Sequence, residues 1–166
     1  MKVELKKWTK DMSGDLIRIC NNVDRQYLSD RIPDPYTEES ADWWLGMVDD
    51  SEGVSGVFRA IVVDGEIAGN ISVEQSSDIY RKVGEIGYLL LTDFWSKGIM
   101  TEAVRLICET AFAELDIVRI NGNTFSPNVA SQRVLEKSGF IKEGTRKKAV
   151  YKNNNFYDLE MYGILK

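Results

Sequence analysis

Residues 86–103 read IGYLLLTDFWSKGIMTEA, which predicts an apolar strand, a short loop and a helix that begins near Gly98. The first backbone N–H groups of such a helix have no partner within it, and the helix dipole places partial positive charge beside them. These groups can therefore hold a phosphate or a pyrophosphate. Gly98 would let a ligand approach the backbone closely, and Lys97 would add a cation. The alternative interpretation is an ordinary strand-to-helix turn that contains a glycine.

Strands and helices alternate on both sides of this segment. The expected strands cover residues 3–8, 57–63, 67–74, 83–91, 118–125, 140–146 and 156–164. The expected helices cover residues 11–22, a stretch capped by Thr37, residues 98–115 and residues 129–137. An Asp64-Gly65 turn predicts a hairpin. No linker or repeat interrupts this order, which predicts one α+β (mixed α/β) domain over residues 1–166.

The composition excludes several kinds of chemistry. The 166 residues include no histidine, which removes a His general base, a Ser-His-Asp or Cys-His nucleophile and every His-containing zinc site. Cys20 and Cys108 are far apart, so we interpret both as packing residues and expect neither a metal nor a disulfide framework. This cysteine usage, and an N-terminus without a signal-peptide core, predict a cytoplasmic protein. No apolar run is long enough for a membrane span, so we expect no membrane partner.

Charge is unevenly distributed along the chain. The net charge of −5 argues against broad nucleic-acid binding, which needs clustered Lys and Arg. Residues 34–52 hold seven acids and no base, whereas residues 119–166 hold nine bases and four acids. Two solvated surfaces explain this pattern. The alternative is a cationic substrate near the first stretch and an anionic ligand near the second.

Several segments resemble one known family. Glu85-Ile86-Gly87-Tyr88 and residues 94–103 are similar to the acetyl-CoA-binding segment of the GNAT N-acetyltransferases, in their RimJ/RimL-like branch. Residues 128–140, NVASQRVLEKSGF, resemble that branch's N-x-x-S-x-R-V-L-E-K-x-G-F pattern. Residues 156–158 and 32–37 resemble its late and early signatures. The segments occur in the family's order over nearly the whole chain.

The resemblance implies a fold and a ligand site. The sheet would be mixed but mostly antiparallel and flanked by helices, with an acetyl-CoA cleft between its two central strands. Backbone groups of Tyr88, Leu89 and Leu90 would hydrogen-bond the acetyl carbonyl and the pantetheine arm of acetyl-CoA. The pyrophosphate would meet the backbone amides of one loop, which are those of Ser96, Lys97, Gly98, Ile99, Met100 and Thr101.

Two polar residues complete the implied ligand site. Asn128 would hydrogen-bond the pantetheine, and it is also a good helix N-cap. Ser131 would lie near the thioester sulfur, or it is an ordinary helix hydroxyl. The chain departs from the family at Ser96, where a Gly is usual, and at Met100, where a small residue is usual. We expect these larger side chains to weaken CoA binding without abolishing it.

The implied chemistry needs a base for the amine and a proton donor for the departing thiolate. Glu85 is our candidate base and Ser131 our candidate acid; the alternative for Glu85 is an exposed strand-end carboxylate. Asn123, Leu135 and Val150 stand where some relatives place other catalytic groups, so those roles do not carry over. An acetyl carbonyl polarised by the Leu89 or Leu90 amide would supply much of the rate.

The sequence also offers a candidate pocket for a cationic amine. Trp43 and Trp44, beside Asp42, Asp49 and Asp50, would line it through acidic and cation–π contacts. The alternative is that one Trp belongs to the core and the acids only solvate a helix.

These observations predict an acetyl-CoA-dependent N-acetyltransferase. Its acceptor would be a primary amine, either a protein N-terminal α-amino group or a polyamine or other small amine. A CoA-binding sensor or interaction module with little catalysis is the alternative. A homodimer is compatible with either interpretation.

Overall fold

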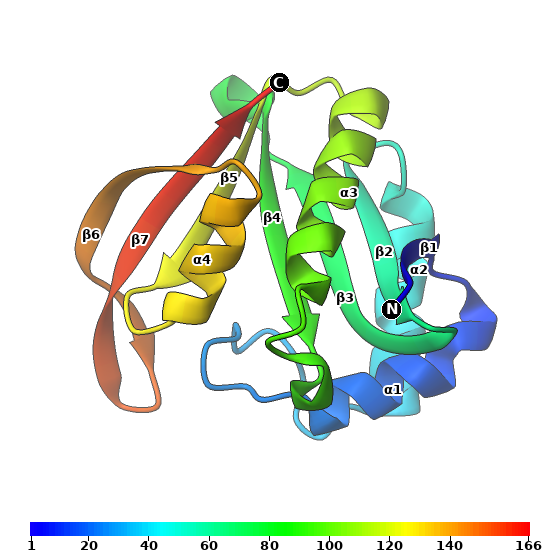
Figure 1. Cartoon of the computed structure of the whole chain (residues 1–166). Helices are drawn as coiled ribbons and strands as arrows, with labels where there is room; N and C mark the ends of the chain where they lie inside the picture. Colours follow the sequence, from blue (N-terminus) through cyan, green and yellow to red (C-terminus); the bar gives the residue numbers. More distant parts are fainter.

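A computed structural model describes residues 1–166 and contains one seven-stranded sheet in the order β1-β2-β3-β4-β5-β7-β6 (Figure 1). The strands are β1 (Val3–Lys7), β2 (Gly56–Val63), β3 (Glu66–Gln75), β4 (Val83–Leu90), β5 (Arg119–Phe125), β6 (Ile141–Lys152) and β7 (Asn155–Leu165). Only β4 and β5 pair in parallel, and every other neighbouring pair is antiparallel. The predicted α+β class, order of elements and mostly antiparallel sheet are confirmed.

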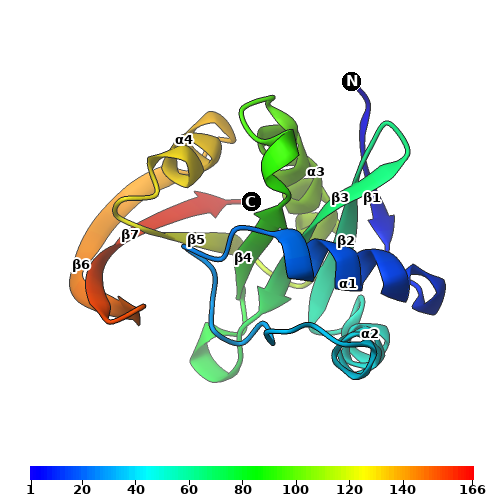
Figure 2. The same ribbon diagram turned by 90° about the horizontal axis from the view of Figure 1, so that it is seen from below.

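Helices cover both faces of the sheet. They are α1 (Ser13–Asn22), α2 (Glu38–Ser51), α3 (Ile99–Glu114) and α4 (Val129–Lys137), with short 3-10 turns at Lys10–Met12, Asp78–Tyr80 and Thr92–Phe94. Viewed from the end of the strands, α3 and α4 lie on one face of the sheet and α2 on the other, with α1 beside α2 (Figure 2). None of these helices is both long enough and apolar enough to cross a membrane.

Local sequence explains several of these boundaries. Thr37 and Ser40 form a reciprocal capping box at the start of α2. Asp64 and Gly65 have positive φ angles of 48° and 88°, which suits the tight turn between β2 and β3. The predicted hairpin is therefore present. The β6 strand runs to Lys152, six residues beyond the predicted end, because its pairing with β7 resumes after an irregularity between Arg146 and Val150.

One apolar core lies on each face of the sheet, and β4 contributes side chains to both cores. Ile86 and Leu90 belong to the core beneath α3, whereas Leu89 belongs to the core beneath α1 and α2. Because side chains alternate along a strand, the even-numbered side chains of β4 lie on the α3/α4 face and the odd-numbered ones lie on the α1/α2 face.

The parallel pairing of β4 with β5 is short. It joins residues 83–85 to residues 119–121, and beyond that point the two strands diverge (Figure 1). We call this divergence the β4–β5 fork; its arms are residues 86–90 and 122–125. The fork leaves an unpaired strand edge at the centre of the sheet, where the family resemblance implies a cleft.

Candidate active site

Hydrogen bonding to β3 decides which backbone groups of β4 face the fork. The Leu91 N–H donates to the Ala68 carbonyl at 2.9 Å, and the Leu89 carbonyl also faces β3, since it would lie 2.3 Å from a Cβ added at Gly69. Backbone groups alternate in direction along a strand, so those of Tyr88 and Leu90 face the fork. The N–H and carbonyl of Leu89 therefore face β3, and among the three predicted backbone contacts those of Tyr88 and Leu90 face the fork.

One of these outward-facing groups already has a partner. The Trp95 indole Nε1 donates to the Leu90 carbonyl at 2.8 Å. Leu90 therefore keeps only its N–H for a ligand in the fork, while Tyr88 keeps both its N–H and its carbonyl. A chain that paired with this edge would do so around Tyr88.

The loop between β4 and α3 presents free amides at the first turn of the helix. Ser96 and Gly98 both have positive φ angles, 58° and 76°, and the backbone turns sharply between them. The first helical bond runs from the Glu102 N–H to the Gly98 carbonyl, and no side chain caps the helix. The N–H groups of Ile99 to Thr101 therefore lack helical acceptors, which makes this turn suited to an anion.

The space around this turn fits a bulky anion. A Cβ placed on Gly98 would meet no atom within 4 Å. Met100 is buried in the core beneath α3, so its side chain does not narrow the approach, contrary to our expectation. The Lys97 ammonium donates to the Asp93 carbonyl at 2.8 Å and lies 5.9 Å from the centre of the Phe94 ring. In this conformation Lys97 stabilises the loop, and the backbone amides supply the donors.

The start of α4 brings the remaining predicted residues to the fork. The Asn128 side chain accepts from the Ser131 N–H at 3.3 Å and caps the helix, as predicted for an N-cap. The Ser131 hydroxyl lies 2.6 Å from the Tyr88 hydroxyl, and this contact joins α4 to the β4 arm of the fork. Burial raises the pKa of the Tyr88 phenol to about 12, so the phenol is neutral at physiological pH. Sequence reasoning identified Ser131 but missed its contact with the Tyr88 side chain.

Glu85 lies on the opposite face of the sheet from Ser131. It lines a cavity of about 280 Å³ together with Arg31 and Glu74, and Glu74 is its direct partner in the β3–β4 pairing. Two carboxylates that face each other across strands repel, and a cation between them relieves that repulsion. The two predicted catalytic residues therefore lie on different faces of the sheet, Glu85 beside a cavity and Ser131 in the first turn of α4.

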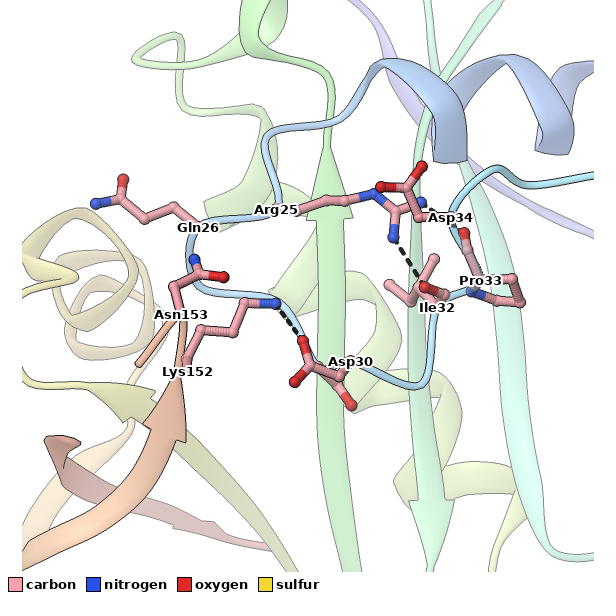
Figure 3. Close-up of a pocket in the computed structure, with 9 residues that line it drawn as sticks. Arg25, Gln26, Asp30, Ile32, Pro33, Asp34, Lys152 and Asn153 are labelled. Carbon is pink, nitrogen blue, oxygen red and sulfur yellow. Dashed lines mark hydrogen bonds and ion pairs between the residues drawn. The ribbon is translucent and has the colours of Figure 1, made fainter. Parts of the chain in front are cut away.

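A second cavity, of about 420 Å³, lies between the loop that follows α1 and the tip of the β6–β7 hairpin (Figure 3). The Lys152 ammonium donates to Asp30 at 2.7 Å and joins the two segments. Arg25 donates to the carbonyls of Ile32 and Pro33 at 2.8 Å each, which fixes the shape of the loop. Sequence reasoning missed this cavity, because its walls lie more than 100 positions apart in the chain.

The predicted tryptophan pocket does not form. Trp44 packs edge-to-face against Trp8, with ring centres 5.7 Å apart, and against Phe58. Trp43 is 72% exposed. Adjacent residues of a helix face different directions, so the two rings do not line one site. The alternative interpretation, one core tryptophan beside solvated acids, describes α2.

Both cysteines are buried packing residues, as predicted. Burial raises the pKa of the Cys20 thiol to about 11 and that of the Cys108 thiol to about 12. Both thiols therefore stay protonated near neutral pH, where they are poor nucleophiles.

This fold, with a forked parallel pair at the centre of an antiparallel sheet and a free helix start beside it, defines the GNAT acetyltransferase class. Residues 2–141 match the model of the acetyltransferase (GNAT) domain, and the chain belongs to that family. The predicted family is confirmed.

Individual relatives are bacterial. The chain is 40% identical over 116 residues to the probable N-acetyltransferase YjcK of Bacillus subtilis. The aligned segment covers 70% of this chain and 63% of YjcK. It is 34% identical over 113 residues to the putative ribosomal N-acetyltransferase YdaF of the same organism, covering 68% and 61%. The chain thus matches about three fifths of the length of these curated relatives.

Solved structures share the fold. RimJ of Mycobacterium smegmatis, described in complex with CoA-disulfide, superposes with a TM-score of 0.85 over 98% of this chain and 81% of that one. The sequence identity is 19%, so this likeness concerns the fold alone.

Proposed function

We propose that this protein is an acetyl-CoA-dependent N-acetyltransferase. The observation that carries the proposal is the run of free amides at the start of α3, directly beside the unpaired edge of β4. A thioester carrier with an anionic diphosphate and an amide-containing arm matches both features. The diphosphate would meet the amides of Gly98 to Thr101, and the arm would pair with Tyr88.

The fit extends to the reactive end of the carrier. An arm that pairs with Tyr88 passes between β4 and the first turn of α4, where Asn128 has a side-chain amide nitrogen and Ser131 a hydroxyl. The Leu90 N–H faces the same fork and would polarise the acetyl carbonyl. Such a donor stabilises the negative charge that develops on this oxygen during attack.

The acceptor amine would approach from the α1/α2 face. There Glu85 lines a cavity with Glu74 and Arg31, and two carboxylates against one guanidinium leave a net negative charge that favours a protonated amine. Glu85 would take the proton that the amine must lose before it attacks the thioester. Ser131, on the other face, would act on the departing sulfur. Base and donor would thus work from opposite sides of the sheet.

Among acceptors, we favour the α-amino group of a polypeptide. YdaF, one of the curated relatives, bears the name of a ribosomal N-acetyltransferase. The 420 Å³ cavity between the loop after α1 and the β6–β7 hairpin offers room for residues that follow a peptide's first amine. A polyamine is the second candidate, because the paired carboxylates of Glu74 and Glu85 suit a compact cation.

Release of free thiol from acetyl-CoA tests the proposal. The reaction would be followed with a panel of N-terminal peptides and with polyamines, and CoA binding would be measured separately by thermal shift. Transfer to a peptide α-amine supports our assignment, and transfer to polyamines alone supports the second candidate. CoA binding without transfer to any acceptor would identify a sensor module instead.

A further inference from the structure

The side chains between β4, β5 and α4 lie in layers. A Cβ added at Gly122 would lie 3.0 Å from a Leu135 methyl carbon and 3.3 Å from an Ile86 methyl carbon. One residue from each element therefore meets at this level, and the contact closes the narrow end of the fork. The layer is apolar and contributes to the core.

The next layer contains three hydroxyl groups. Tyr88 and Thr124 lie two residues after Ile86 and Gly122 in their strands. Ser131 lies one helical turn before Leu135 in α4. Of these hydroxyls, only those of Tyr88 and Ser131 are hydrogen-bonded to each other, at 2.6 Å. The buried Thr124 hydroxyl has no partner. Ser131 therefore has one neighbour in the layer that fixes the direction of its O–H group.

The chemistry of the two groups indicates which of them donates. A phenol is a more acidic hydroxyl than a serine and hence the better donor, while the serine oxygen is the better acceptor. Burial raises the pKa of Tyr88 to about 12, so its proton is present throughout the working range of pH. With its oxygen engaged by Tyr88, the serine's own hydrogen is free to point toward the fork.

We propose that Tyr88 is a positioning residue for acetyl transfer, and that its phenol O–H orients the Ser131 hydroxyl toward the sulfur of the thioester. This inference rests on the proposed function. The amine nitrogen forms a bond to the acetyl carbon and gives its proton to Glu85. As the carbon–sulfur bond then breaks, its electron pair moves onto the sulfur, and Ser131 donates a hydrogen bond to that growing charge. The thiolate leaves and takes its proton from water, while Ser131 and Tyr88 keep theirs. A hydrogen bond that strengthens only in the transition state raises kcat rather than substrate affinity.

Tyr88→Phe tests this directly, because it removes the phenol oxygen and preserves the ring. We expect kcat to fall by roughly tenfold, with the KM for acetyl-CoA and the dissociation constant of CoA unchanged within about twofold. Ser131→Ala should lower kcat at least as much. The double variant should be no slower than Ser131→Ala alone, because Tyr88 acts only through the serine.

Tyr162→Phe is the matched control. Tyr162 is also buried, and its hydroxyl lies 2.9 Å from a Glu136 carboxylate oxygen, away from Ser131. Its loss should lower the melting temperature and leave kcat at the wild-type value.

Three results would overturn the inference: wild-type kcat in Tyr88→Phe, losses that multiply in the double variant, or a loss of CoA affinity that matches the loss of kcat. If the wild type and Tyr88→Phe transfer acetyl groups equally well, only this inference is defeated. Wild-type protein inactive toward every acceptor would defeat the proposed function and the inference with it.

Discussion

The α3 turn and the cavity at the β6–β7 hairpin are built in opposite ways. At the α3 turn, consecutive backbone amides from Gly98 to Thr101 would form the proposed diphosphate site, and one short stretch of sequence specifies them. At the hairpin cavity, Asp30 and Lys152 come together from segments 122 positions apart. A site made of backbone donors can be identified from local sequence, whereas a site made of distant side chains requires the fold.

Gly98→Asp should produce the largest effect on the backbone site. It places a negative side chain beside the proposed diphosphate, and we expect acetyl-CoA affinity to fall by roughly a hundredfold or more. Isothermal titration would measure it. Gly53→Asp is the matched control, since Gly53 has a similar φ of 74° and equally open surroundings. Equal losses of affinity in both variants would contradict the role of the α3 turn.

Glu85→Gln tests the face of the sheet from which we propose that the acceptor approaches. Removing the base should lower kcat by roughly a hundredfold near neutral pH and leave CoA affinity intact. Glu74→Gln, which alters the carboxylate paired with Glu85, should have a smaller effect. If Glu85→Gln keeps the activity and pH profile of the wild type, another group is the base.

Asp30→Asn tests the side-chain cavity. Lys152 has a side chain only 9% exposed, so without Asp30 its charge is left without a partner and the loop loosens from the hairpin. We expect the KM for a peptide acceptor to rise by roughly fivefold, with the KM for acetyl-CoA unchanged. Asp116→Asn breaks an exposed ion pair with Lys82 and should change neither value. A matching rise in both KM values would show that the two sites are not independent.

Acid should weaken the hairpin more than the α3 turn. Hydrogen bonds from Lys142, Thr145 and Ser126 lower the pKa of Glu160 to about 2, from an ordinary value of 4.5. Its stabilising contribution is therefore complete above pH 4.5 and is lost as the pH falls toward 2. Glu160→Gln should lower the melting temperature at pH 7, and the difference from the wild type should vanish near pH 2. A difference that is constant with pH would argue against this role.

Ser96→Gly should have the smallest effect. Ser96 adopts a φ of 58°, where a side chain costs about 1 kcal/mol and glycine does not. We expect the free energy of unfolding to rise by about that amount, as measured in urea, with a modest gain in CoA affinity. A less stable variant would mean that the serine side chain contributes contacts that outweigh the strain.

The same contrast explains what could be predicted from the sequence. Hydrophobic periodicity and turn residues predicted the order of the elements, and the motif at residues 94–103 predicted the position of the α3 turn. The direction of the Leu89 peptide groups could not be predicted, because it depends on which strand is the neighbour. The Tyr88–Ser131 contact spans 43 positions and depends on how α4 lies against the fork. No local pattern encodes either feature.

The parallel pairing of β4 with β5 has an electrostatic consequence. Helix α3 follows β4 and returns the chain to the start of β5, which runs parallel to β4. Helix α4 follows β5, so both helices begin where their preceding strands end. The positive ends of both helix dipoles therefore lie at the same edge of the sheet. A protein with a net charge of −5 thus creates a local attraction for anions from peptide dipoles rather than from lysines. Because these helix starts are exposed to solvent, salt screens this attraction, and anion binding here should weaken as the ionic strength rises.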